Sequence, residues 1–282
     1  MSRLRALRYY AGAAWRRLNP TPEQAAWRRM CRLADRVPRH TRGRVQAMHY
    51  ELDYVDLLST CPQWEELFVH HSLAFRATTE TPRVLDCGAN IGLATLAIKR
   101  AHPKARVTAF EADPSLATVL VSNLARNGAQ DVECVPAAVW TAPGEVSFLA
   151  EGSDSGAIAG VTASMAAPTI QVRAVRLRDW IAREPIDLLK LDIEGAEGDV
   201  LRDCEDVLGH VAAIHMEVHD FVPGRRQLPA CLELLERAGF VTALSNLVPA
   251  SWRAADTAGS PFAGPPPIWI VIVKAWRRPA AA

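Results

Sequence analysis

Short apolar runs alternate with amphipathic stretches along most of this chain, from Pro82 to its C-terminal end. Apolar runs between turn signals are typical of buried strands, and a 3.6-residue apolar period is typical of surface helices. Their alternation predicts an α/β fold with a doubly wound, mostly parallel sheet of seven strands. The expected strands are 83–87, 106–111, 132–136, 187–192, 211–218, 240–245 and 268–273.

Helices are expected between these strands, at 91–101, 114–127, 177–183, 195–208 and 227–238. Asp113 is a candidate N-cap for the second of them, because its carboxylate can accept from the first free amides and Pro114 suits the first helical turn. Two further short strands are expected at 146–149 and 170–175.

The N-terminal part of the chain is strongly basic. Residues 1–44 hold twelve arginines against Glu23 and Asp35, a net charge of +10, so the overall +1 hides a charge of −9 on the remainder. Residues 45–80 are expected to be mainly helical, broken at Pro62, and to form a cap beside a ligand-binding turn. The predicted organisation is a basic helical extension (1–44), a helical cap (45–80) and an α/β domain (81–278).

The first 18 residues can be drawn as an amphipathic helix with Leu4, Leu7 and Trp15 on one side and arginines on the other. A basic helix of this kind suggests contact with an anionic membrane surface. The alternative is a solvated helix that packs on its own domain or on a partner enzyme. No basic platform interleaved with aromatic residues follows, so nucleic acid is not an expected partner.

Cysteine spacing and hydropathy indicate the compartment. The six cysteines are scattered, with no Cys-x-x-Cys pair, which argues against a zinc site or a disulfide framework and favours a reducing compartment. No stretch reaches the ~18 uninterrupted apolar residues of a membrane span. We expect a cytoplasmic protein, with peripheral contact at the inner membrane surface as the possibility that the basic extension raises.

The segment 84–92, Val-Leu-Asp-Cys-Gly-Ala-Asn-Ile-Gly, is expected to run from a buried strand through a glycine turn into a helix. Such a turn lets a ligand approach the backbone closely, and Glu111 at the end of the next strand can accept from both ribose hydroxyls. The pattern differs from the dinucleotide fingerprint Gly-x-Gly-x-x-Gly, and Asp86 would repel a pyrophosphate. A nicotinamide-dependent dehydrogenase is therefore not expected. A nucleoside with a positive charge here, such as S-adenosylmethionine, fits better.

A second polar cluster follows the strand 187–192. Strand residues alternate faces, so Lys190, Asp192 and Glu194 share one side, near the glycine turn at the point where strand order reverses. Crowded carboxylates need an offset, which could be Lys190, a metal ion, a cationic cofactor or a neutral protonation state. Glu197, in the first turn of the next helix, is expected to have a structural role.

The next strand places His215, Glu217 and His219 on one face. Residues four apart on a strand are ~13 Å from each other, so all three cannot bind one ion. Glu217 or His219 could join Asp192 in an oxygen-rich, magnesium-like site, but a divalent metal is not favoured. His219 can instead serve as a general base, and His215 is expected in the core.

These motifs resemble those of the FkbM-type S-adenosylmethionine-dependent methyltransferases. The likeness covers residues 82–240 and rests on the segments 84–92, 110–114 (Phe-Glu-Ala-Asp-Pro) and 189–197 (Leu-Lys-Leu-Asp-Ile-Glu-Gly-Ala-Glu). It implies a Rossmann-like methyltransferase fold, S-adenosylmethionine as cofactor, and methyl transfer to a hydroxyl of a sugar, glycan, glycolipid or natural product. The last of the three segments is the most specific.

The resemblance also implies roles for single residues. The cofactor-binding residues would be Asp86, Gly88, Asn90, Gly92 and Glu111, and the catalytic residues Asp192, Glu194, His219 and Lys190. The Ser153-Asp154-Ser155 loop is a candidate acceptor contact. The alternative function is a catalytically silent nucleoside-binding module that docks on a membrane or partner through its basic arm.

Overall fold

The structure is a computed structural model that describes residues 19–150, 156–159, 169–221, 226–247 and 268–277. The chain forms two compact units, Met1–Ser72 and Leu73–Ala282. Within the described part of the chain, no helix is both long enough and apolar enough to cross a membrane. The predicted helix at residues 1–18 and the Ser153-Asp154-Ser155 loop lie outside the described residues.

Residues 45–80 are not mainly helical, contrary to the prediction. An antiparallel hairpin opens this region, and its inward side chains alternate with exposed ones as strands require. The spacing of Leu52, Val55 and Leu58 favoured a helix, but the period-two burial of Val45 and Leu52 with their neighbours decides for strands. Its elements are α2 (Pro22–Ala34), β1 (Gly43–Ala47), β2 (Tyr50–Tyr54), α3 (Leu57–Trp64) and a π-helical turn, η1 (Glu65–Val69).

Two features of the first unit explain its helices. Thr21 and Gln24 form a reciprocal capping box that starts α2. Pro62 lies inside α3 rather than breaking it, and the chain widens into the π-helical turn directly after Trp64. Trp64 stacks on Phe68 with ring centroids 4.1 Å apart, so this turn is packed into the core of the unit. The predicted role of residues 45–80 as a cap stays a prediction.

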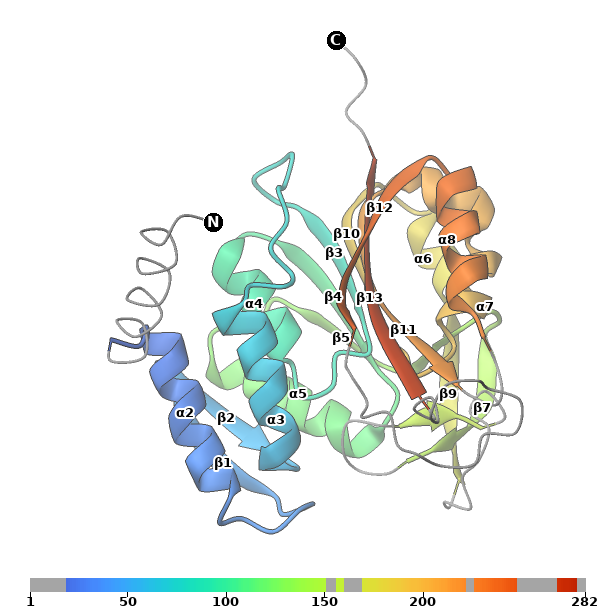
Figure 1. Cartoon of the computed structure of the whole chain (residues 1–282). Coiled ribbons are helices and arrows are strands. Elements are labelled where there is room, and N and C mark those ends of the chain that lie inside the picture. Colours follow the sequence, from blue (N-terminus) through green and yellow to red (C-terminus); the bar gives the residue numbers. More distant parts are fainter. Residues whose placement is uncertain (1–18, 151–155, 160–168, 222–225, 248–267, 278–282) are drawn as a thin grey trace, which may run out of the picture. The chain divides into compact units, whose positions relative to one another are not determined.

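The second unit contains a seven-stranded sheet in the order β12-β13-β11-β10-β3-β4-β5 (Figure 1). All neighbouring pairs from β11 to β5 are parallel, and β13 is antiparallel to both β11 and β12. The mostly parallel seven-stranded sheet is thus the one that the alternating pattern predicted. Its strands are β3 (Arg83–Cys87), β4 (Arg106–Glu111), β5 (Glu133–Pro136), β10 (Ile186–Leu191), β11 (Val211–Phe221), β12 (Phe240–Leu247) and β13 (Ile268–Arg277).

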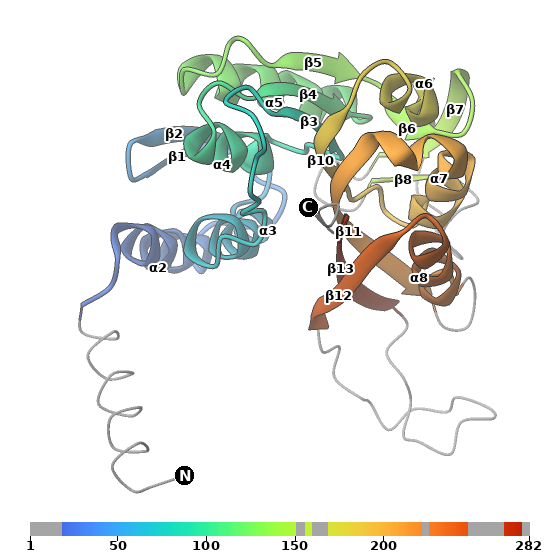
Figure 2. The same cartoon turned by 90° about the horizontal axis from the view of Figure 1, so that it is seen from above.

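Helices cover both faces of this sheet. From β3 the chain winds outward to β4 and β5, then returns to β10 on the other side of β3 and winds toward β11. Right-handed crossovers in opposite directions place helices on opposite faces, with α4 and α5 on one side and α6, α7 and α8 on the other (Figure 2). The helices are α4 (Leu93–Ala101), α5 (Pro114–Arg126), α6 (Leu177–Ile181), α7 (Glu197–Asp203) and α8 (Leu228–Arg237).

Two details depart from the expected elements. The helix expected at 195–208 is the short α7 followed by a 3₁₀ turn, η2 (Glu205–His210). The short strands between β5 and β10 form a separate four-stranded sheet in the order β6-β9-β7-β8. Its strands are β6 (Ala138–Trp140), β7 (Gly144–Leu149), β8 (Ala157–Ile158) and β9 (Thr169–Arg176).

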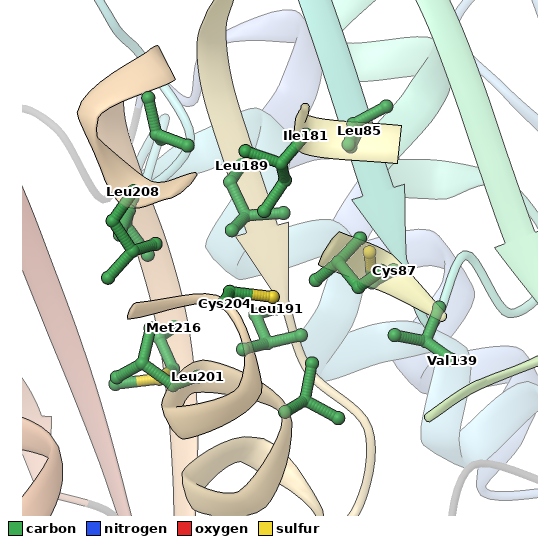
Figure 3. Packing of buried hydrophobic residues seen from close by; sticks show 14 of the residues in the cluster. Leu85, Cys87, Val139, Ile181, Leu189, Leu191, Leu201, Cys204, Leu208 and Met216 are labelled. Atoms are coloured by element: carbon green, nitrogen blue, oxygen red, sulfur yellow. The ribbon is translucent and has the colours of Figure 1, made fainter. Parts of the chain in front are cut away.

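One hydrophobic cluster of the core lies between the sheet and the helices α6 to α8. Leu85, Leu189 and Met216 come from three adjacent strands and pack against side chains of the helical layer (Figure 3). Every residue of β3 is buried, as expected for a central parallel strand. Fully burying one such leucine stabilises a fold by roughly 1.5–3 kcal/mol, so this layer holds the strand ends in fixed positions.

Candidate active site

The turn between β3 and α4 contacts two neighbouring segments through its backbone, the end of β4 and the residue that follows β10. Gly88 and Ala89 donate their amides to the carbonyl oxygen of Phe110 on β4, at 3.1 and 2.8 Å. Gly88 has a φ of +80°, and a Cβ on it would lie 1.8 Å from the carbonyl oxygen of Asp192. A side chain at this position is excluded by both the conformation and the contact, so glycine is required.

Asn90 and Gly92 complete this turn in left-handed conformations, with φ values of +51° and +94°. The side-chain amide of the buried Asn123 on α5 donates to the carbonyl oxygen of Ile91 at 2.9 Å and so anchors the turn to α5. Gly92 is the N-cap of α4 and offers no side-chain cap. The first amides of α4 are therefore available to a ligand.

Glu111 ends β4 beside this turn and is almost completely buried. Its Oε2 accepts from the Asn90 amide at 2.7 Å and its Oε1 from the Asp113 amide at 2.9 Å. Burial raises the pKa of Glu111 to about 7, although both amides oppose the shift. Each carboxylate oxygen has a second lone pair, so the side chain can still accept from two hydroxyls.

Lys190 links the two polar clusters that the sequence predicted. Its Nζ lies 3.4 Å from Asp86 Oδ1 and 3.3 Å from Asp192 Oδ2, and it donates to the Gly88 carbonyl oxygen at 2.8 Å. The register of β10 against β3 pairs Lys190 with Asp86 directly. Burial alone would lower the pKa of Lys190, but Asp192 and Asp86 raise it above its usual value. The lysine is therefore a buried cation that offsets the crowded carboxylates.

Asp86 is completely buried. Its Oδ2 accepts from the Thr95 hydroxyl on α4 at 2.6 Å, a partner that the sequence gave no reason to single out. Its Oδ1 faces Lys190. Asp86 therefore contributes a buried negative charge beside the turn, next to the Lys190 cation.

A tight turn after β10 carries Asp192 and Glu194, and Glu197 holds it in shape. Glu194 has a φ of +56°, which is unusual for a residue with a side chain. Glu197 is fully buried at the start of α7, and its Oε1 accepts from the amides of Ile193 and Gly195 at 3.1 and 3.0 Å. Glu197 therefore has a structural role, as expected, but through the preceding turn as well as the helix.

His219, near the end of β11, lies between carboxylates on both sides. Its Nδ1 is 3.2 Å from Glu197 Oε1, and its Nε2 is 3.3 Å from Glu194 Oε2 and 3.6 Å from Glu217 Oε1. Burial would lower the pKa of His219, but Glu194 and Glu197 raise it well above its usual value. An imidazolium donates from both nitrogens, which suits this setting. In this form His219 cannot accept a proton, whereas a neutral ring could; its role as a general base stays a prediction.

Glu194 has the opposite tendency. Burial raises its pKa well above the usual value, neighbouring carboxylates add to the rise, and His219 opposes it. Glu194 and His219 thus lie 3.3 Å apart, from Oε2 to Nε2, and each affects the pKa of the other. A raised pKa makes the ionised carboxylate of Glu194 a stronger base than an ordinary carboxylate.

Asp192, Glu194 and His219 also form a set whose potential ligand atoms lie within 4.8 Å of one another. Two carboxylates and an imidazole could together hold a divalent cation. Metal binding needs a free lone pair on His219 Nε2, so an ion would have to displace the proton that the surrounding carboxylates favour. The prediction that a metal is possible but not favoured stays a prediction.

Two further buried residues, His215 and Gln227, lie next to the site. His215 is buried as expected, and burial together with Lys190 and Lys274 lowers its pKa to about 3, so it is neutral. Gln227 was not anticipated, although its side chain reaches the turn after β10 and the end of β11. The sequence did not predict this role, because a glutamine next to the start of a helix looks the same in sequence whether it is buried or exposed.

The family model of the methyltransferase FkbM domain matches residues 86–242, more than half of the chain. The matched range begins at Asp86 on β3 and ends in β12. It contains every residue predicted here to bind cofactor or take part in catalysis.

Several curated proteins are similar to this chain. Methyltransferase sdnD of Sordaria araneosa is 29% identical over 176 residues, which are 51% of this chain and 68% of that protein. The 2-O-methyltransferase NoeI of Sinorhizobium fredii is 28% identical over 190 residues, 60% of this chain and 77% of that protein. Among solved structures, an FkbM methyltransferase of Methylobacillus flagellatus is 15% identical with a TM-score of 0.49, covering 78% of this chain and 53% of that chain.

Proposed function

The chain belongs to the FkbM methyltransferase domain family, and from this premise we propose that it transfers a methyl group from S-adenosylmethionine to a hydroxyl group. The observation that carries the proposal is the junction of the two polar clusters. Lys190 bridges Asp86 beside the glycine turn and Asp192 beside Glu194. The proposed nucleoside site and the proposed proton-accepting site would therefore lie side by side, at the ends of the neighbouring strands β3 and β10.

The cofactor would lie on the turn between β3 and α4. Glu111 would accept from the ribose hydroxyls, and Gly88, Asn90 and Gly92 would shape the pocket for the methionine part. Asp86 would act through Lys190. S-adenosylmethionine carries an ammonium and a sulfonium, and these positive charges suit the surplus of carboxylates at these strand ends.

The reaction would be an in-line displacement. When bound, S-adenosylmethionine supplies a methyl group activated by a sulfonium. The acceptor oxygen would form the new bond to the methyl carbon as the carbon–sulfur bond breaks, with S-adenosylhomocysteine as the leaving group. Asp192 or Glu194 would take the hydroxyl proton, while His219 holds Glu194 by its Nε2 hydrogen. Alignment of the reactants can lower such a barrier by roughly 7–11 kcal/mol.

The acceptor would be a polar hydroxylated molecule, which we place among sugars, glycans, glycolipids and natural products. The similarity to a 2-O-methyltransferase supports oxygen as the methylated atom. The carboxylates of Asp192 and Glu194 support it too, since both are partly accessible and can hydrogen-bond hydroxyl groups.

We also propose that residues 1–44 make peripheral contact with an anionic membrane, at the inner surface of the cytoplasmic membrane. Arg29, Arg32 and Arg36 are exposed, and none forms an ion pair with another described residue. Leu33, 40% exposed, lies among them. Cations beside an exposed apolar side chain suit a lipid surface.

The methyl-transfer proposal is tested by incubating the protein with methyl-labelled S-adenosylmethionine and a panel of hydroxylated sugars and glycolipids. Label should appear in at least one acceptor, and Asp192→Asn should lower the rate by about 10²–10⁴-fold. Asp199→Asn is the matched control, because its side chain is 26% exposed against 28% for Asp192. Full activity of Asp192→Asn would place the chemistry elsewhere.

A silent nucleoside-binding module is the alternative outcome of the same experiment. Such a protein would bind S-adenosylhomocysteine but label no acceptor. A silent module has no need for Glu194 and His219 in close contact beside Asp192, which is why we favour the enzyme.

A further inference from the structure

One buried amide side chain joins the three segments that carry the proposed acceptor-side residues. Gln227, next to the start of α8, is 3% exposed. Its Nε2 donates toward the carbonyl oxygens of Gly195 and His219 and toward Glu197 Oε2, at 3.1, 2.9 and 2.9 Å. Its Oε1 accepts from the Gly198 amide at 2.8 Å.

The surroundings of Gln227 are built to hold it in place. Asp220, also buried, accepts from the Gln227 amide at 2.6 Å and from the Leu228 amide at 3.1 Å, so the backbone on both sides is fixed. A Cβ on Gly198 would lie 2.7 Å from Gln227 Oε1. Glycine at 198 therefore leaves the space that the amide group occupies.

Glu197 passes this restraint on to the proposed catalytic pair. Gln227 holds Oε2 of Glu197, while Oε1 of the same carboxylate accepts from the turn amides of Ile193 and Gly195 and faces Nδ1 of His219. The other ring nitrogen of His219 faces Glu194. The orientation of Glu194 thus depends on a chain of contacts that begins at Gln227.

We propose that Gln227 is a positioning residue for methyl transfer, which acts through Glu197 to fix the His219 ring and the turn that carries Asp192 and Glu194. The inference rests on the proposed function of that site. Gln227 itself contacts neither acceptor nor cofactor in this role. We expect its loss to lower the rate of transfer and to leave cofactor affinity unchanged. The reason is that Gln227 contacts neither the glycine turn nor Glu111 in the contacts described above.

Gln227→Leu removes the donors and the acceptor while keeping a similar side-chain volume. We expect kcat to fall about 10–100-fold, the range seen when outer partners of functional groups are lost, with S-adenosylhomocysteine affinity unchanged within about twofold. Unchanged kcat would overturn the proposal. Equal losses in kcat and in cofactor affinity would also overturn it, because they would indicate general damage to the fold.

Gln227→Glu tests the positioning role through the pH dependence of activity, which a purely structural role would leave unchanged. The introduced carboxyl can donate to Glu197 only while protonated, and ionisation places two carboxylates together. Among the described residues, Glu197 is the ionisable side chain that the Gln227 side chain contacts; its contact with His219 is to the backbone carbonyl oxygen, and Asp220, paired with Arg226, accepts from the Gln227 backbone amide. Activity relative to the native chain should therefore be highest at low pH and fall as pH rises. A pH profile parallel to the native one would contradict the proposal.

Gln130→Glu is the control, since Gln130 is exposed on the same unit and its side chain donates to the Ala125 carbonyl oxygen in the last turn of α5, away from the site. Nitrogen-15 NMR of the His219 ring separates this inference from the proposed function. Two protonated ring nitrogens are expected in the native chain, and Gln227→Leu should shift the Nδ1 signal. If no acceptor is methylated but the signal shifts, the function fails and the positioning stands. An unmoved signal would refute the positioning.

Discussion

Burial and close charges set the protonation of the residues at the strand ends. Glu111 has its pKa raised to about 7 by burial, whereas the buried Lys190 stays charged because Asp192 and Asp86 flank it. Glu194 and Glu197 raise the pKa of His219 well above its usual value in spite of its burial. Residue types and spacing predicted which side chains gather here. They did not predict the charge of His219, because that depends on carboxylates brought in by a turn and by α7.

Cofactor affinity should depend on the ionisation of Glu111. Ribose hydroxyls are donors, so they bind the carboxylate better than the protonated acid. With a pKa of about 7 in the free protein, S-adenosylhomocysteine should bind about tenfold more tightly at about pH 8 than at about pH 6. Isothermal titration across this range measures it. Glu111→Gln should bind weakly with little pH dependence, and an equally steep dependence in that variant would assign the titration to another group.

Removal of divalent ions should leave methyl transfer nearly unchanged. Both ring nitrogens of His219 face carboxylate oxygens, which favours a proton over a metal at Nε2. The check compares activity after treatment with EDTA and after addition of Mg²⁺ or Mn²⁺ at a fixed pH. Loss with EDTA and recovery with Mg²⁺ would instead assign Asp192, Glu194 and His219 to a metal site.

Most elements of the second unit followed from the sequence, apart from the division of 195–208 into α7 and η2 and the separate four-stranded sheet, whereas the hairpin of the first unit did not. The strands β3 and β4 have the predicted bounds, because continuous apolar runs end in strong turn signals. Residues 45–54 mix apolar and polar positions that fit a helix and a strand about equally, and pairing across the hairpin decides between them. The Gln227 contacts could not be predicted, since they join segments far apart in the chain.

The turn after β3 should be intolerant of any side chain at Gly88. Gly88→Ala combines a left-handed φ with a Cβ placed 1.8 Å from the Asp192 carbonyl oxygen. We expect a loss of more than about 2 kcal/mol in the free energy of unfolding, or loss of cofactor binding if the turn shifts. Gly128→Ala is the control, because φ is +77° there but nothing lies within 4 Å. It should cost only about 1 kcal/mol in urea unfolding, and equal costs at both sites would refute the close contact.

The whole chain combines a basic N-terminal segment with an acidic remainder. The net charges of +10 over residues 1–44 and −9 over the rest favour separate partners for the two parts, a negatively charged surface for one and a cationic ligand for the other. The sequence showed this asymmetry in full. The structure adds that Arg29, Arg32 and Arg36 are exposed.

Binding to anionic vesicles should depend on these arginines. A chain with Arg29→Glu, Arg32→Glu and Arg36→Glu should bind phosphatidylglycerol vesicles roughly 100-fold more weakly, at ~1 kcal/mol for each basic residue lost. Co-sedimentation of the full chain at low and high salt measures it. The control carries the same reversals at Arg126, Arg173 and Arg202, all in the second unit. No binding of the native chain would remove the membrane proposal.

The most direct measurement is the titration of the folded protein with S-adenosylhomocysteine, the expected product, in the native chain and in Glu111→Ala. The account predicts micromolar binding that Glu111→Ala abolishes while circular dichroism shows an intact fold. Glu145→Ala, at an exposed carboxylate on β7, should bind as the native chain does. Absence of binding to the folded native chain, or equal affinity of Glu111→Ala, would contradict the proposed cofactor site and with it the methyl-transfer reaction built on that site.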